Sequence, residues 1–101
     1  MSPARFLLPA EVEMIEAAVY YEAQVPGLGD AFLAKIDSAV RDIRERPTAW
    51  PAIGGDIRKR LVHRFPYAVL YRVDPEEVVV VAIMHQRRRP DYWVGRIWSA
   101  Q

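Results

Sequence analysis

The run Val78–Ile83 constrains the fold most, because six consecutive apolar residues leave no polar position to face water. Its length and valine content predict a strand at the centre of a sheet, covered on both faces. The preceding run Tyr67–Val73 is also rich in strand-forming residues, and Asp74-Pro75-Glu76-Glu77 between the two runs is typical of a turn. We therefore expect two adjacent antiparallel strands joined by a short connection.

A third strand is predicted just before these two, with apolar and basic residues alternating at period two: Ile57, Leu61 and Phe65 against Arg58, Arg60 and Arg64. If helices cover the face that bears Ile57, the three arginines line the open face of the sheet. Such a basic face fits two interpretations. It is either a solvated strand that protects against aggregation, or a binding surface for carboxylate or phosphate groups.

The first half of the chain has a helical period instead. An apolar stripe predicts a helix from Ala10 that ends before Pro26-Gly27, with glutamates at the polar positions: Val12, Ile15, Val19 and Ala23 against Glu11, Glu13, Glu16 and Glu22. A second amphipathic helix is predicted from Leu28 to Arg46, where Pro47 stops it. The short connection favours an antiparallel helical hairpin. Residues 6–8 are expected to form a brief strand or extended lead-in, and residues 47–55 a loop.

These elements predict an α+β fold for one domain spanning residues 1–101. An antiparallel sheet of three to four strands, about residues 56–86, is covered on one face by the helical hairpin, about residues 10–46. A basic and aromatic tail, residues 87–101, follows the sheet.

Composition excludes several classes of function. The chain has no cysteine and only two histidines, so we predict no metal site, and no cofactor motif of the P-loop or dinucleotide-binding kind is present. One of the histidines, His63, is expected to be a packed side chain rather than a ligand. No apolar run is long enough to span a membrane, and no secretory signal is evident, so a soluble, cytoplasmic protein is expected.

Charge is distributed unevenly, with five Lys and Arg against eight Asp and Glu in residues 1–51 and nine against five in residues 52–101. This asymmetry indicates either an ordinary uneven surface or a C-terminal half that faces a polyanion or an acidic partner. The basic residues gather after the last strand, beside a histidine and two aromatic residues: His85, Arg87, Arg88, Arg89, Tyr92 and Trp93.

This C-terminal cluster has two interpretations. Arginines and aromatic rings together can hold a nucleic-acid backbone and stack its bases, and His85 could act as a general acid or base. Alternatively, the arginines are a solvated surface, and Tyr92 and Trp93 anchor the tail to the core, which we favour for Trp93. Arg72 stands in the middle of a strand, where a charge must be paired or exposed.

The order and spacing of several short motifs resemble the RelE/ParE superfamily of toxins from type II toxin–antitoxin modules, often labelled plasmid stabilisation proteins. The resemblance covers nearly the whole chain and rests on these segments: Tyr20-Tyr21-Glu22, Pro26-Gly27-Leu28-Gly29, Arg46-Pro47, Phe65-Pro66-Tyr67, Tyr71-Arg72-Val73 and His85 to Pro90 with Tyr92-Trp93.

The resemblance implies a small α+β toxin held inactive by a cognate antitoxin, as a homodimer or a toxin–antitoxin heterotetramer. RelE-like members cleave mRNA on the ribosome, whereas ParE-like members poison DNA gyrase. In a RelE-like enzyme, the catalytic set implied here is Arg58, Arg60, Arg64, Arg87, Tyr92 and His85. In either case Arg72, Arg88, Arg89 and Trp93 are implied to contact the target or the antitoxin, which we expect to contribute an acidic, partly apolar segment along the basic half.

The chain departs from the RelE-like nucleases in its catalytic strand, where arginines leave Lys59 as the one lysine. Arginine stays charged and is therefore a poor proton donor or acceptor. In addition, Trp93 stands where a catalytic tyrosine is expected, with Tyr92 one position earlier. We therefore favour a ParE-like inhibitor of gyrase over an mRNA endoribonuclease.

Overall fold

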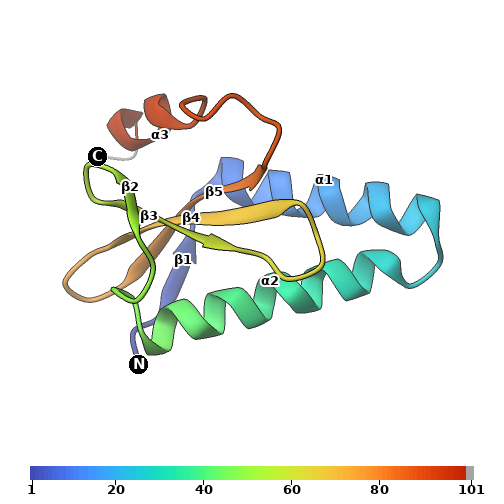
Figure 1. The fold of residues 1–101 in the computed structure, drawn as a ribbon, viewed down its shortest axis with the longest axis horizontal. Coiled ribbons are helices and arrows are strands. Elements are labelled where there is room, and N and C mark those ends of the chain that lie inside the picture. Colours follow the sequence, from blue (N-terminus) through green and yellow to red (C-terminus); the bar gives the residue numbers. More distant parts are fainter. Residues whose placement is uncertain (100–101) are drawn as a thin grey trace.

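The computed structural model describes residues 1–99 and has two long helices, five strands and a short C-terminal helix within them (Figure 1). The elements follow in the order β1 (Ala4–Phe6), α1 (Leu8–Gln24), α2 (Leu28–Glu45), β2 (Ala52–Gly54), β3 (Ile57–Leu61), β4 (Tyr67–Val73), β5 (Val78–His85) and α3 (Val94–Ser99). The predicted α+β class is confirmed, and both helices of the hairpin lie within two residues of the predicted bounds.

The sheet has five strands in the order β1-β5-β4-β3-β2, rather than three to four. The predicted antiparallel pairing of β3, β4 and β5 is confirmed, but β1 pairs in parallel with β5, from Ala4 opposite Val78 to Phe6 opposite Val80. The predicted 47–55 loop also contains an edge strand, β2. The strand β2 escaped prediction, and β1 was expected at residues 6–8 rather than at Ala4–Phe6, because each strand is three residues long, too short to show a period.

The position of Pro9 at the start of α1 differs from the prediction. The sequence places a brief strand at residues 6–8 that Pro9 ends, but the strand ends at Phe6 and Pro9 lies in the first turn of α1. A proline is tolerated there because the N–H that it lacks would have no partner within the helix.

A glutamate at the end of α1 fixes the turn of the hairpin. The Glu22 carboxylate accepts hydrogen bonds from the backbone N–H groups of Gly27 and Gly29, at 2.8 and 3.0 Å, and so satisfies donors at the start of α2. A Cβ atom at Gly29 would lie 2.5 Å from the carbonyl oxygen of Ala18. The glycine therefore allows the two helix backbones to approach closely.

The sheet is covered on both faces. The hairpin packs on one face, where Phe32, Ile36 and Ile43 of α2 join alternate residues of β4 and β5. The opposite face carries the C-terminal segment, and Trp93 and Ile97 pack there against Leu70 and other strand residues. In Figure 1, α3 accordingly lies on the far side of the strands from α2. The prediction that β5 is central and covered on both faces is confirmed, since Val78 to Met84 are all buried.

Two faces lie opposite to the arrangement that the sequence patterns favoured. On β3, Ile57 packs with the Trp93 cluster, whereas the neighbouring Arg58 and Arg60 point to the hairpin side, and the strand ends at Leu61, before Arg64. The buried residues of α1 are alanines, and the predicted stripe faces out: Val12, Ile15 and Val19 are exposed. His63 is also exposed rather than packed.

Candidate functional site

The site begins at an incomplete edge of β5. The strand β1 pairs with β5 only as far as Val80, so the later residues of β5 have no neighbouring strand on that side. Two side chains take the place of a neighbouring strand there. The Ile83 N–H donates to the Glu13 carboxylate at 3.1 Å, and the Val81 carbonyl accepts from the Arg96 guanidinium at 3.2 Å. Side chains from α1 and α3 thus satisfy backbone groups of the central strand.

Glu13 and Arg96 also bind each other and a tyrosine. The guanidinium of Arg96 donates to both carboxylate oxygens of Glu13, at 2.8 and 2.9 Å, and the Tyr92 hydroxyl donates to the same carboxylate at 2.6 Å. The Glu13 and Arg96 side chains are only 14% and 18% exposed. A bidentate pair in this setting holds the C-terminal segment against α1.

The hydroxyl of Tyr92 is committed to this network. Burial raises the pKa of Tyr92 above its usual range, and the hydrogen bond to the Glu13 carboxylate raises it further. The ring also contacts two guanidinium groups, with Arg88 at 4.0 Å and Arg96 at 4.9 Å from its centroid. Tyr92 therefore stays protonated near neutral pH and donates its proton to Glu13.

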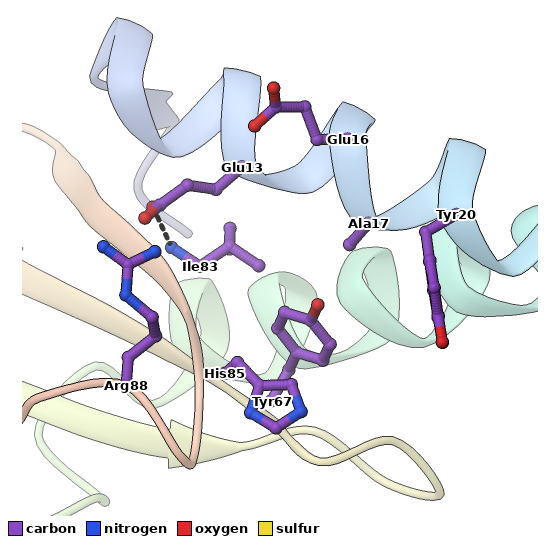
Figure 2. Close-up of a pocket in the computed structure, with 8 residues that line it drawn as sticks. All are labelled: Glu13, Glu16, Ala17, Tyr20, Tyr67, Ile83, His85 and Arg88. Carbon is purple, nitrogen blue, oxygen red and sulfur yellow. Dashed lines mark hydrogen bonds between the residues drawn. The ribbon is translucent and has the colours of Figure 1, made fainter.

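A cavity of about 350 Å³ lies beside the network, between α1 and the ends of β4 and β5 (Figure 2). Side chains of α1 form one side of it, and side chains from β4, β5 and the following turn form the other. The lining residues are Glu13, Glu16, Ala17, Tyr20, Tyr67, Ile83, His85 and Arg88. The cavity therefore combines carboxylates, aromatic rings, an imidazole and a guanidinium.

His85 has a defined orientation in this cavity. Its Nδ1 accepts the backbone N–H of Arg87 at 3.0 Å, and its ring packs edge-on against Tyr67 with centroids 5.0 Å apart. Because Nδ1 accepts, the neutral ring carries its proton on Nε2, which can serve as a donor.

Two turns that carry basic residues meet at this end of the sheet. The Gln86 N–H donates to the Pro66 carbonyl at 2.9 Å and so joins the β3–β4 turn to the segment after β5. We call the resulting surface the basic end and define it as Arg64, Arg87 and Arg88. Within residues 1–99, Arg64 and Arg87 are the two arginines whose side chains make no hydrogen bond, ion pair or aromatic contact. They are the cations most available to a partner.

The strand arginines lie apart from the basic end. The guanidinium of Arg58 donates to the carbonyls of Trp50 and Thr48, and that of Arg60 donates to the Asp42 carboxylate at 2.7 Å. Arg60 also stacks over the Trp50 ring, with 5.1 Å to the centroid. The strand that carries them is separated from β5 by β4, about 10 Å across the sheet. Arg58 fastens the loop after α2 to β3, and Arg60 fastens both that loop and α2 itself.

The remaining predicted residues also have partners in the fold. Arg72 binds Asp74 at 2.8 Å, so this mid-strand charge is paired, and Arg89 forms an exposed ion pair with Asp91 at 3.1 Å. The buried Trp93 donates its indole N–H to the Pro90 carbonyl. The interpretation of Trp93 as a core anchor of the tail is thus confirmed.

Two central residues of the site, Glu13 and Arg96, were not singled out from the sequence. Glu13 stands among the polar positions of an apparently outward face, and its partner lies near the other end of the chain. No local pattern marks such a pair. The one available signal was the aromatic pair Tyr92-Trp93, which indicated that the tail is anchored but not to what.

Within the described part of the chain, no group of three or more His, Asp or Glu side chains is placed to hold a metal ion. No helix among residues 1–99 is both long and apolar enough to cross a bilayer.

Comparison with known proteins identified a protein family and a structural neighbour. Residues 5–90 match the family model described as the ParE toxin of the type II toxin–antitoxin system parDE. The fold is similar to a solved structure described as the chromosomal ParDE TA system from P. aeruginosa, with a TM-score of 0.74 and 16% identity, covering 84% of this chain and 96% of that one. A comparison with curated proteins gave no match.

Proposed function

Because the chain belongs to the ParE toxin family, we propose that it inhibits DNA gyrase and that a cognate antitoxin neutralises it in the cytoplasm. The family match over residues 5–90 carries this proposal, since it spans the hairpin, the sheet and the basic end. As a toxin of a ParDE system, the chain has an antitoxin as its natural partner. What we propose is the target, DNA gyrase, and neutralisation of the toxin by its antitoxin.

The strand arginines bind other groups of the fold, which supports gyrase inhibition over RNA cleavage. A nuclease needs cations aimed at the scissile phosphate and a group that can exchange a proton. Here Arg58 and Arg60 bind protein carbonyls and Asp42, and the Tyr92 hydroxyl binds Glu13. These three groups are occupied within the fold and do not converge on the cavity beside His85.

We assign contact with an acidic surface to the basic end. Arg64 and Arg87 are exposed and without side-chain partners among the described residues, and Arg88 lines the cavity. Arginine is suited to carboxylates and phosphates because its planar fork can donate two parallel hydrogen bonds. The antitoxin's acidic segment is proposed to bind here rather than on the second face of the sheet, since the C-terminal segment already covers much of that face.

The test is a supercoiling assay with purified chain, gyrase and relaxed plasmid. We expect inhibition by the unaltered chain and at least about ten-fold weaker inhibition by Arg87→Ala, because an exposed cation is lost without a structural contact. Arg41→Ala is the matched control. It removes the same charge from α2, where Arg41 binds only Asp37, and should inhibit like the unaltered chain. Failure to inhibit gyrase at any concentration would contradict the proposal.

An mRNA endoribonuclease is the alternative, favoured by one observation. His85 and Arg88 both line one cavity, so a group that can act as a general acid and a phosphate-binding cation border the same space. New RNA 5′ ends phased to codons, appearing minutes after induction without antitoxin, would establish this alternative. Growth arrest without such ends is expected if gyrase is the target.

A further inference from the structure

The cavity between α1 and the ends of β4 and β5 is lined by polar groups that the fold leaves without hydrogen-bond partners. Among residues 1–99, these groups are the Glu16 carboxylate, the Tyr67 hydroxyl, the His85 Nε2 and the Arg88 guanidinium. A small number of polar groups that converge on one cavity is typical of a site that binds a small molecule. The chemistry of these groups therefore indicates what the cavity can bind.

Three of the four groups are hydrogen-bond donors. Arg88 stacks over the Tyr92 ring, 4.0 Å from its centroid, and this contact leaves its N–H groups free. His85 carries its ring proton on Nε2, because Nδ1 accepts the Arg87 N–H. Burial raises the pKa of Tyr67, so its hydroxyl keeps its proton near neutral pH. Three donors around one cavity favour a ligand with a carboxylate or a similar anionic group.

The fourth group is a carboxylate without a partner. Glu13 also lines the cavity, but Arg96 and Tyr92 bind its carboxylate and compensate its charge. The uncompensated charges are therefore one negative, on Glu16, and one positive, on Arg88, which form no ion pair with each other in the described part of the chain. A simple anion such as phosphate would leave Glu16 unpaired and would be repelled by it. A ligand that satisfies both groups carries one negative and one positive charge.

The rest of the lining is apolar or aromatic. Ala17 and Ile83 are buried, and Tyr20 and Tyr67 contribute rings. In Figure 2, Tyr20 lies toward one end of the cavity and Arg88 toward the other. The volume of about 350 Å³ is near the small end of the range for ligand pockets, about 300–1,000 Å³. The ligand is therefore small, with an apolar or aromatic body beside its two charged groups.

We propose that this cavity binds a free aromatic α-amino acid. Its α-carboxylate accepts hydrogen bonds from Arg88 and His85, and its α-ammonium group binds Glu16. Its ring packs against Tyr20, over the buried Ala17 and Ile83. An α-amino acid carries both charged groups and the side chain on one carbon, and it is neutral overall, like the pair of free charges that it meets. The inference is independent of the proposed function, because neither gyrase nor an antitoxin takes part in it.

The test is isothermal titration calorimetry of the full chain with L-phenylalanine as the probe. We expect saturable binding at one site. L-phenylalaninamide lacks the carboxylate and N-acetyl-L-phenylalanine lacks the ammonium group, so each should bind at least about ten-fold more weakly, since a hydrogen-bonded charge is lost. L-alanine retains both charges but has no ring, and it should also bind at least about ten-fold more weakly.

Variants locate the binding. Glu16→Gln should weaken binding of L-phenylalanine at least about ten-fold, because the ammonium group loses its counter-charge. Glu11→Gln is the matched control, since Glu11 is also an exposed residue of α1 but does not line the cavity, and it should leave the affinity unchanged. Circular dichroism melting of both variants checks that each is folded.

Three results would overturn the proposal. The first is the absence of saturable binding of L-phenylalanine to the unaltered, folded chain. The second is equal affinity of Glu16→Gln and Glu11→Gln, which would place the amino acid outside this cavity. The third is equal affinity for L-phenylalanine and its N-acetyl derivative, because the site would then recognise a carboxylate alone, as at the end of a peptide.

Discussion

The two long helices form one hairpin, yet they use their apolar residues differently. In α2 the apolar stripe is the buried stripe, with Phe32, Ile36 and Ile43 against the sheet. In α1 most large apolar residues face out, Met14 and Tyr21 excepted, and small ones, Ala10 and Ala17 among them, face the sheet. Hydrophobic period alone therefore identifies a helix reliably but identifies its inward face only where a single face is apolar.

Close packing explains why α1 buries its small residues. Gly29 brings the start of α2 against the Ala18 carbonyl, and the aromatic rings of Tyr21, Phe32 and Phe65 fill the adjacent core. Because these rings, including Tyr21 of α1 itself, fill the volume, the fully buried positions of α1 take only short side chains. Most other large apolar residues of α1 lie at the surface.

The largest effect on the free energy of unfolding is expected from a substitution on the buried face of α2. Phe32→Ala should lower the free energy of unfolding by about 3–5 kcal/mol, because it empties a fully buried site that three aromatic rings contact. Leu33→Ala, at the next position but half-exposed, should cost about 1 kcal/mol or less. Urea denaturation measures both. Equal losses of unfolding free energy in the two variants would contradict the distinction between a buried and an exposed side of α2.

A smaller effect is expected at the polar side of α1. Glu13→Gln should cost about 1–3 kcal/mol, because it leaves the largely buried Arg96 without its carboxylate. Glu16→Gln, one turn along and without an ion pair among the described residues, should change stability by less than about 0.5 kcal/mol.

Denaturation gives the global loss, and amide hydrogen exchange of residues 92–97 shows whether it begins in the C-terminal segment. Faster exchange in Glu13→Gln alone supports the anchoring role. If both variants behave alike, Glu13 is an ordinary surface residue.

The smallest effect on the free energy of unfolding is expected from a substitution on the outer face of α1. Ile15→Ser should change the free energy of unfolding by less than about 0.5 kcal/mol, since the side chain is half-exposed. Ile36→Ser, the same change on the buried face of α2, should cost several times more. Thermal denaturation compares the two. A loss above about 2 kcal/mol for Ile15→Ser would mean that α1 has a packed outer face.

Local pattern was enough for the hairpin and for strands β3 to β5, whose periods, turns and stops lie within each segment. It was not enough for β1, which pairs with the distant β5, or for β2, a three-residue strand that pairs with the adjacent β3. The site was harder still. The family resemblance grouped Arg58, Arg60, Arg64 and Arg87 in one catalytic set, but the partners that separate the first two from the last two are fixed only by the fold.

The parallel pairing of β1 with β5 has a consequence for how the toxin is made. The Pro3 carbonyl accepts from the Val78 N–H, and the Leu7 N–H donates to the Val80 carbonyl, so β1 pairs with a strand that is synthesised much later. Contacts between segments far apart in the sequence form late, because the intervening chain must be closed first. A nascent toxin is therefore expected to stay incompletely folded until β5 has left the ribosome. A cell that makes toxin and antitoxin together gains that interval before any folded toxin exists.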